Sequence, residues 1–185
     1  MEKEFTITVF TENKLGLLQR VVAIITKRHI NIESIAASES SMKGIHRFTL
    51  VLNLTDEQVR KLTLQIEKQV DVLKAFYYET SEIVYQEIAL YKVATQSFFQ
   101  SDDTEELLRR HNARILSIEP EYIVIEKTGH KEETNALLEE LRIIGIYEFA
   151  RSGRVAIVKP MERLNNHLKS VDKKRNHKKL ESNNI

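Results

Sequence analysis

Hydrophobic and polar residues change their spacing along the first 30 positions of the chain. Residues Glu4–Thr11 alternate and are rich in Phe, Ile, Val and Thr, which predicts a β-strand. Apolar residues then recur at spacings of three and four, which predicts an amphipathic helix with a buried face. Asn13 is a favourable N-cap, so we expect the helix to start there. The buried stripe is predicted to contain Leu15, Leu18, Val22 and Ile25, widened by Leu17, Val21 and Ile24.

Further changes of period complete a first structural unit near residue 80. Strands are predicted at Ile30–Ser38 and Ile45–Asn53, with the polar, glycine-containing stretch ESSMKG as the turn between them. Thr55 and Gln58 form a capping box that starts a second helix, and Val70–Tyr78 follows as a strand. The order is βαββαβ, which is typical of the ferredoxin-like arrangement of two helices on one face of an antiparallel sheet.

The same order of elements recurs from Gln86 onward, although the residues differ. The predicted elements are a strand at 87–95, a helix containing Leu107 and Leu108 and capped by Ser101, Asp102 and Asp103, strands at 113–120 and 121–128, a helix at Glu132–Arg142, a strand at 146–153 and a short extra strand at 154–158. The pattern predicts an α+β fold of two tandem ferredoxin-like βαββαβ units, with domains at residues 1–80 and 84–160. Residues 161–185 lose the periodicity and collect Lys, Arg, His and Asn, which predicts a disordered basic tail.

Apolar residues of the first unit fall on both faces of its predicted sheet. The alternating sets are Ile7 and Val9 against Thr8 and Phe10, and Val72 and Phe76 against Leu73 and Tyr77. Helices can cover only one of these faces, and an exposed apolar face usually needs a partner sheet or subunit. We therefore predict at least a dimer.

Composition narrows the classes of function. At 185 residues with 42% hydrophobic content, the chain can bury a packed core. Its 28 Lys and Arg residues against 27 Asp and Glu residues argue against a protein built to bind nucleic acid or an anionic membrane. The lack of cysteine excludes disulfides, thiol catalysis and thiolate metal sites. No apolar run has the length of a membrane span and the N-terminus has no signal-peptide pattern, so we expect a cytoplasmic protein.

The sequence contains few residues arranged for catalysis. None of its six histidines is paired at a metal-ligand spacing with a supporting carboxylate, so we expect no metal site. The carboxylates Asp102, Asp103, Glu105 and Glu106 cluster at a predicted helix start, where the helix dipole favours them. Glycine-rich phosphate motifs and the GxSxG nucleophile motif are absent from the sequence. We therefore do not expect this chain to be an enzyme.

The turn before the first helix has the chemistry of an amino-acid site. Gly16 falls in the first turn, where main-chain N–H groups have no partner inside the helix, and a glycine there lets a carboxylate approach closely. Asn31 follows the helix, so a second carboxamide could lie near Asn13. Two carboxamides can donate to a carboxylate and accept from an ammonium group. The alternative is structural, with Asn13 as a cap, Gly16 as a turn residue and Asn31 as a helix stop.

Three blocks of this sequence, ENKLGLLQRVVAIITKRHINIESI, QIEKQVDVLKAF and FARSG, together resemble the small regulatory subunit of acetohydroxyacid synthase (acetolactate synthase). The resemblance covers about residues 4 to 158, and the first unit resembles an ACT domain, a module that binds amino acids at the seam between paired copies. It implies a homodimer through the ACT-like domains and a partner, the catalytic large subunit. Thiamine diphosphate, Mg2+ and FAD are expected on that partner, with no cofactor in this chain. The implied role is to activate the large subunit and confer feedback inhibition by a branched-chain amino acid, usually valine.

The resemblance also implies which residues hold the effector. Asn13 and Gly16 match the effector loop, and Asn31 matches an asparagine that reaches the bound amino acid across the interface. The isopropyl group of valine is expected among Leu15, Leu17 and Ile32. Two positions depart from the family pattern: Leu15 stands where many relatives have proline, and His29 stands where many have a glycine in a left-handed C-cap. These departures bear on effector affinity more than on fold.

Other classes of function fit parts of the pattern. A stand-alone ACT-type regulator of another enzyme would share the amino-acid site. A ferredoxin-like enzyme of the acylphosphatase kind would share the topology, but the sequence lacks a glycine-rich phosphate loop that ends in arginine. An RNA-binding ferredoxin-like module would need aromatic residues on the central strands of a basic sheet. Phe48 and Tyr91 fit such positions, but strand packing accounts for them.

Overall fold

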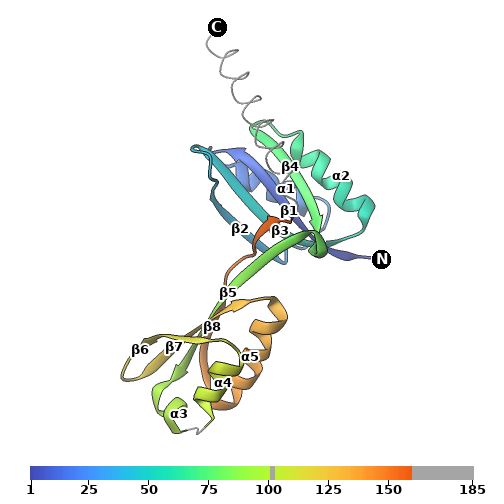
Figure 1. Ribbon diagram of the computed structural model, residues 1–185. Helices are drawn as coiled ribbons and strands as arrows, with labels where there is room; N and C mark the ends of the chain where they lie inside the picture. The colour runs from blue at the N-terminus through green and yellow to red at the C-terminus, as the bar shows by residue number, and fades with distance from the viewer. Residues whose placement is uncertain (101–102, 160–185) are drawn as a thin grey trace. The chain divides into compact units, whose positions relative to one another are not determined.

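The computed structural model describes residues 1–100 and 103–159 of the 185-residue chain (Figure 1). The chain divides into two compact units. The first unit consists of Met1–Val84 together with the segment that begins at Ala156, and the second of Tyr85–Val155. The predicted tail and the predicted capping residues Ser101 and Asp102 lie outside the described residues.

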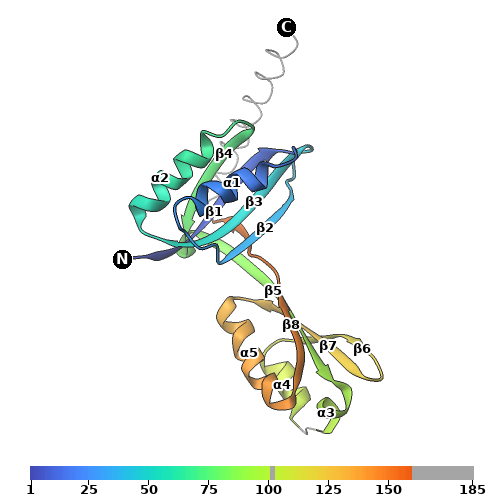
Figure 2. The same cartoon turned by 180° about the vertical axis from the view of Figure 1, so that it is seen from behind.

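The first unit has the predicted βαββαβ order (Figures 1 and 2). Its elements are β1 (Lys3–Glu12), α1 (Leu17–Thr26), β2 (Ser34–Glu39), β3 (Ile45–Leu54), α2 (Asp56–Glu67) and β4 (Val72–Glu79), followed by the 3-10 turn η1 (Thr80–Glu82). The described strands form an antiparallel sheet in the order β2-β3-β1-β4, so β2 and β4 are its edges. The capping box predicted for α2 is present, because Thr55 and Gln58 exchange hydrogen bonds. The predicted fold class is confirmed.

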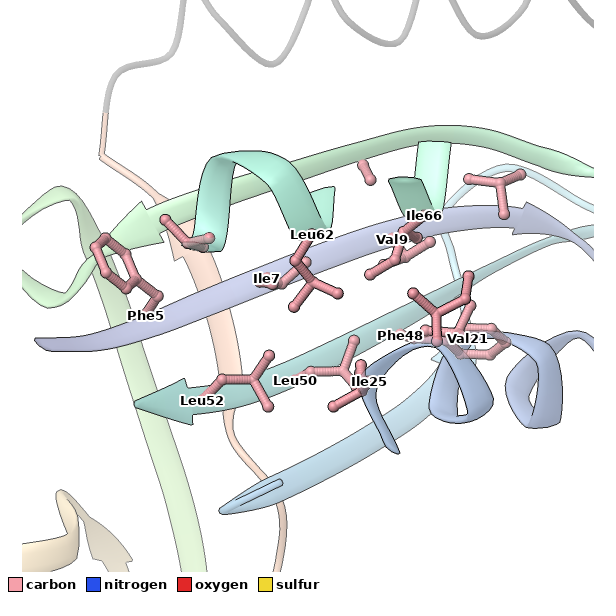
Figure 3. Packing of buried hydrophobic residues seen from close by; sticks show 14 of the residues in the cluster. Phe5, Ile7, Val9, Val21, Ile25, Phe48, Leu50, Leu52, Leu62 and Ile66 are labelled. Atoms are coloured by element: carbon pink, nitrogen blue, oxygen red, sulfur yellow. The ribbon is translucent and has the colours of Figure 1, made fainter. Parts of the chain in front are cut away.

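A single apolar core lies between this sheet and its two helices (Figure 3). Alternate residues of β1 and β3 point into it, as the period of two predicts. The strand residues are Phe5, Ile7 and Val9 on β1 and Phe48, Leu50 and Leu52 on β3, and the facing helix residues include Val21, Ile25, Leu62 and Ile66. Full burial of each aliphatic side chain contributes about 1.5–3 kcal/mol, so this layer supplies the main stabilisation of the unit.

The first helix begins later than we predicted. Gly16, in the left-handed region at φ 80°, is its N-cap, so the prediction that Asn13 caps the helix is wrong. The chain before Gly16 is not helical, because the left-handed conformation of Gly16 interrupts right-handed helix geometry and the first intrahelical bond runs from Arg20 N–H to Gly16 O. Outside the helix, Asn13 N–H donates to Gly44 O and Lys14 N–H donates to Glu12 O.

The late start also changes which face of α1 is buried. Leu15 lies outside the helix and is 98% exposed, and Leu18 is 37% exposed, so neither belongs to the buried stripe we predicted. Successive helix residues are about 100° apart, so the sequence carries two overlapping apolar stripes. The buried one contains Leu17, Val21, Ile24 and Ile25.

The face of the first sheet opposite its helices is less exposed than the alternation of apolar residues along the strands suggested. On this face Thr8 is 3% exposed, Val51 is 2% exposed and Leu73 is 1% exposed, all within the single chain. Part of this cover comes from the segment after β8, since the Arg47 guanidinium on this face donates from Nη2 to the main-chain oxygen of Ala156. Alternation along a strand cannot show that a distant segment of the same chain lies there. Dimerisation therefore stays a prediction.

The second unit repeats the architecture with an added helix. Its elements are β5 (Ile83–Ala94), α3 (Thr95–Gln100), α4 (Thr104–Arg110), β6 (Arg114–Ile118), β7 (Tyr122–Gly129), α5 (Lys131–Ile144) and β8 (Ile146–Arg151). The predicted extra strand β9 (Val155–Val158) follows, and from Ala156 onward it belongs to the first unit. Within the described residues, the strands follow the order β6-β7-β5-β8, and β9 pairs with β5. Side chains from α3, α4 and α5 share one core with β5 and β7. The short helix α3 has no counterpart in the sequence prediction.

Candidate functional site

The loop between β1 and α1 is held by main-chain hydrogen bonds to two distant turns. Glu12 N–H donates to the oxygen of Asp71 at 3.1 Å, and Asn13 N–H donates to the oxygen of Gly44 at 3.1 Å. These bonds fix the loop at the end of the sheet where β1 ends and β3 and β4 begin. The side chains of Asn13 and Leu15 are exposed there. The loop therefore presents two of the predicted site residues to solvent.

The N-terminal end of α1 has the features of an anion site. The first intrahelical bond runs from Arg20 N–H to Gly16 O, so the N–H groups of the first turn point out of the helix. Among the described residues no side chain caps this end, and the first turn carries no acidic residue. A β-carbon placed on Gly16 would meet none of the described atoms within 4 Å, so the space beside the turn is open. The helix dipole and the outward N–H groups favour a carboxylate in this position.

The three apolar residues that are predicted to contact an effector differ in their exposure to solvent. Leu17 is 1% exposed and belongs to the core of the first unit, so its side chain faces the sheet. Ile32 is partly buried and packs against the same core. Leu15 is the one of the three that extends fully into solvent. Within one chain, Leu17 and Ile32 therefore pack in the core, and Leu15 is the one exposed enough to contact an effector.

The two predicted carboxamides lie at opposite ends of α1. The ten residues of this helix separate the Asn13 loop from the Asn31 segment by about 15 Å at 1.5 Å per residue. Asn31 is exposed and donates from Nδ2 to Glu33 Oε1 at 3.1 Å. His29 has φ 56°, so the left-handed conformation expected at this position is confirmed. The two amides of one chain therefore cannot hold the same small amino acid.

Side chains of opposite charge form ion pairs around the loop between β1 and α1. Lys14 Nζ lies 2.7 Å from Asp71 Oδ1 and 3.0 Å from Glu12 Oε2, and Arg20 Nη1 lies 3.9 Å from Asp71 Oδ2. The hydrogen bond to Asp71 and then the bond to Glu12 raise the pKa of Lys14 above its ordinary value. Lys14 therefore stays cationic throughout the physiological range. Sequence reasoning missed Asp71, because 57 residues separate it from Lys14.

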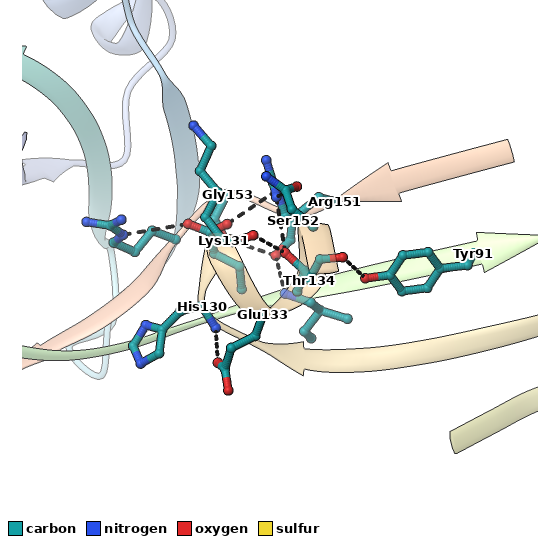
Figure 4. Close-up of polar contacts among 12 residues, drawn as sticks. Tyr91, His130, Lys131, Glu133, Thr134, Arg151, Ser152 and Gly153 are labelled. Atoms are coloured by element: carbon teal, nitrogen blue, oxygen red, sulfur yellow. Dashed lines mark hydrogen bonds and ion pairs between the residues drawn. The ribbon is translucent and has the colours of Figure 1, made fainter. Parts of the chain in front are cut away.

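The FARSG block has a structural role in the second unit (Figure 4). Arg151 donates from Nη1 to Thr134 Oγ1 at 3.1 Å and to Asn135 Oδ1 at 2.8 Å, which ties β8 to the first turn of α5. Ser152 N–H donates to Ile88 O at 2.8 Å, and Ile88 N–H donates to Ser152 Oγ at 2.9 Å. These bonds join the end of β8 to β5.

A buried carboxylate completes this cluster. Glu87, 5% exposed, lies 3.4 Å from Arg151 Nε and 3.7 Å from Arg154 Nε, and the Arg154 guanidinium lies 3.9 Å from the ring centre of Tyr85. Tyr91 donates from its hydroxyl to Thr134 O at 2.6 Å, and burial raises the pKa of Tyr91 to about 12. The phenol is therefore neutral at physiological pH and acts as a hydrogen-bond donor. No sequence motif marked Glu87 or Thr134 in advance.

Other classes of site find little support in the described part of the chain. Its His, Asp and Glu residues form no group of three that could hold a metal ion. Among its helices, none combines the length and the hydrophobicity that crossing a bilayer requires. Phe48 and Tyr91 are 5% and 0% exposed and lie in the two cores. Neither aromatic ring can stack on an RNA base, in agreement with the prediction that strand packing accounts for both.

Family models match both units of the chain. Residues 7–74 match a model described as the ACT domain of acetohydroxyacid synthase small-subunit-like proteins, and residues 86–160 match a model described as the small subunit of acetolactate synthase. The first match contains the Asn13 loop and all of α1, and the second contains the cluster around Arg151.

Whole-chain comparisons give the same result. The acetolactate synthase small subunit of Bacillus subtilis is 34% identical over 160 residues, which cover 86% of this chain and 91% of the relative. A probable acetolactate synthase small subunit of Methanothermobacter thermautotrophicus is 34% identical over 151 residues, covering 82% and 90%. The crystal structure of the acetolactate synthase small subunit from Thermotoga maritima superposes with a TM-score of 0.77 at 26% identity, covering 85% of this chain and 98% of that one.

Proposed function

This chain belongs to the acetolactate synthase small-subunit family, and on that basis we propose that it is a non-catalytic regulatory subunit. It binds a catalytic large subunit, raises the activity of that subunit and makes it sensitive to feedback inhibition by a branched-chain amino acid, with valine as the expected effector. Thiamine diphosphate, Mg2+ and FAD belong to the large subunit. The complex acts in the cytoplasm, in the synthesis of valine, leucine and isoleucine.

The uncapped N-terminal end of α1 is the observation on which effector binding depends. Gly16 opens this end, its φ of 80° suits glycine, and the outward N–H groups can receive the carboxylate of an amino acid. The exposed Asn13 carboxamide lies on the same loop and can accept a hydrogen bond from the ammonium group. Leu15 supplies exposed apolar surface for a branched side chain.

Pairing of two copies through β2 brings the second carboxamide to this site. β2 is an edge strand of the described sheet, and its Ile35 is 37% exposed. A twofold axis that joins two such edges sets the strands antiparallel, so opposite ends of the two copies meet. Asn31 lies at the end of the unit opposite Gly16, and the partner's Asn31 then comes to lie beside the Gly16 turn. This geometry supports a homodimer in which each effector site uses both copies, at the first domain, residues 1–80.

Inhibition follows from linkage between the effector and the arrangement of the paired units. Valine that binds one arrangement better than another shifts the population toward it, and activation of the large subunit falls accordingly. The coupling cannot exceed the difference in affinity, which is typically about 1–3 kcal/mol. The second domain, residues 84–160, lies outside this effector site and can serve in docking to the large subunit.

Reconstitution with the large subunit from the same organism tests this function. The two chains are co-expressed and captured through a tag on the large subunit, and acetolactate formation is measured with and without this chain and with increasing valine. We expect co-capture, higher activity with the chain present, and inhibition by valine only in its presence. Acetolactate formation by the isolated chain, or an unchanged large-subunit activity, would refute the proposal. Valine binding without an effect on the large subunit would favour an ACT-type regulator of another enzyme.

A further inference from the structure

Asp71 connects three elements around the Gly16 turn. It lies between α2 and β4, has φ 70° and keeps its side chain 15% exposed. Its main-chain oxygen accepts from Glu12 N–H at 3.1 Å, and its carboxylate lies 2.7 Å from Lys14 Nζ and 3.9 Å from Arg20 Nη1. One residue of a distant turn therefore contacts the end of β1, the loop and the helix.

These contacts restrict the conformations of Lys14 and Leu15, the part of the loop before the helix. The side chains of Lys14 and Leu15 are largely exposed, and among the described residues no side chain caps the helix that follows. A long, exposed lysine side chain loses rotamer freedom only when a partner holds it. The carboxylate of Asp71 is that partner, together with Glu12 on the loop itself.

We propose that Asp71 is a positioning residue for effector binding, which acts by holding Lys14 and thereby the loop between β1 and α1 in its binding conformation. This inference rests on the proposed function, because it concerns the same site. Asp71 also forms ion pairs with Lys14 and Arg20, so these two cations are already engaged. The effector carboxylate therefore binds to the N–H groups of the helix end. Loss of the Asp71 charge leaves the two main-chain bonds in place but releases Lys14 beside the Gly16 turn, and ordering this part of the loop again on binding lowers the affinity.

Substitutions of Asp71 and Lys14, singly and together, distinguish positioning of the loop from a role in stability alone. Asp71→Asn removes the charge, keeps the main-chain acceptor and tolerates a positive φ, so the turn itself is preserved. Lys14→Gln removes the other partner, and the double variant closes a double-mutant cycle. Glu67→Gln is the matched control, because it breaks the 2.6 Å pair between Glu67 and Lys74 in the same unit, which includes no residue of the loop. Valine binding to the full-length chain is measured by calorimetric titration, with thermal unfolding of each variant alongside.

We expect Asp71→Asn to raise the dissociation constant for valine by about twofold to fivefold, the range of an exposed ion pair, with the Glu67→Gln value equal to wild type. The double variant should lose less affinity than the product of the two single losses. Unchanged or tighter binding by Asp71→Asn, or losses that simply multiply, would overturn the role of Asp71 while wild-type binding keeps the proposed function intact. If the wild-type chain binds no valine, both fail.

Discussion

Replacing Gly16 with aspartate places a negative charge where the effector carboxylate is expected to dock. Gly16 has φ 80°, so any other residue there carries left-handed strain of about 1–2 kcal/mol, and aspartate tolerates this region better than most. A β-carbon would meet none of the described atoms within 4 Å, so no steric clash adds to the strain. Against a typical stability of about 5–15 kcal/mol, the variant should fold.

The electrostatic effect on binding is larger than the effect on folding. Two unit charges about 4 Å apart repel each other by about 1 kcal/mol in water and about 4 kcal/mol at the effective dielectric constant near a protein surface. The new carboxylate also competes for the N–H groups of the first turn. Gly16→Asp should therefore weaken valine binding about tenfold or more, which leaves an active complex that resists valine.

The assay compares three versions of the reconstituted complex. Acetolactate formation is titrated with valine for wild type, Gly16→Asp and Gly16→Asn, since asparagine has the same shape as aspartate, tolerates positive φ and carries no charge. We expect near-normal activity without valine in all three, strong resistance in Gly16→Asp, and a shift of at most about threefold in Gly16→Asn. Equal valine sensitivity in Gly16→Asp and wild type would remove Gly16 from the site. Equal resistance in the two variants would show that space, not charge, governs the effect.

Three further predictions concern the second carboxamide and the second unit. Asn31→Ala should weaken valine binding without unfolding the chain, and unchanged affinity in a calorimetric titration would count against its role across the interface. Glu87→Gln removes a buried carboxylate shared by two arginines and should lower the free energy of unfolding by about 3 kcal/mol in urea, whereas Glu139→Gln, in an exposed pair on α5, should change it by less than about 0.5 kcal/mol. Burial raises the pKa of Tyr91 to about 12, above the value of about 10 in the unfolded chain, so its stabilisation is complete below pH 10 and is lost as the pH rises to 12. Unfolding in urea at pH 9 and pH 11 should show this loss in wild type and a smaller one in Tyr91→Phe; identical losses would contradict it.

The α1 region shows how far local sequence reasoning extends. Glycine at position 16 and the apolar period after it correctly indicated a helix that begins at this glycine turn. The prediction that Asn13 caps this helix failed, because the left-handed Gly16 sets the helix start and Asn13 lies before it, where its N–H donates to Gly44 O. A hydrogen-bonding partner 31 positions away leaves no signal in the spacing of apolar residues.

Local patterns in the sequence determined the order of strands and helices, the repeated βαββαβ architecture and the glycine-opened turn, because each depends on residues within a few positions of one another. Tertiary structure alone decided which stripe of α1 faces the sheet, which face of that sheet is covered, and that Asp71 and Glu87 stand beside the loop and the FARSG block. These outcomes depend on contacts between residues far apart in the chain. Only the folded backbone brings such residues together, so their partners cannot be derived from periodicity or local chemistry.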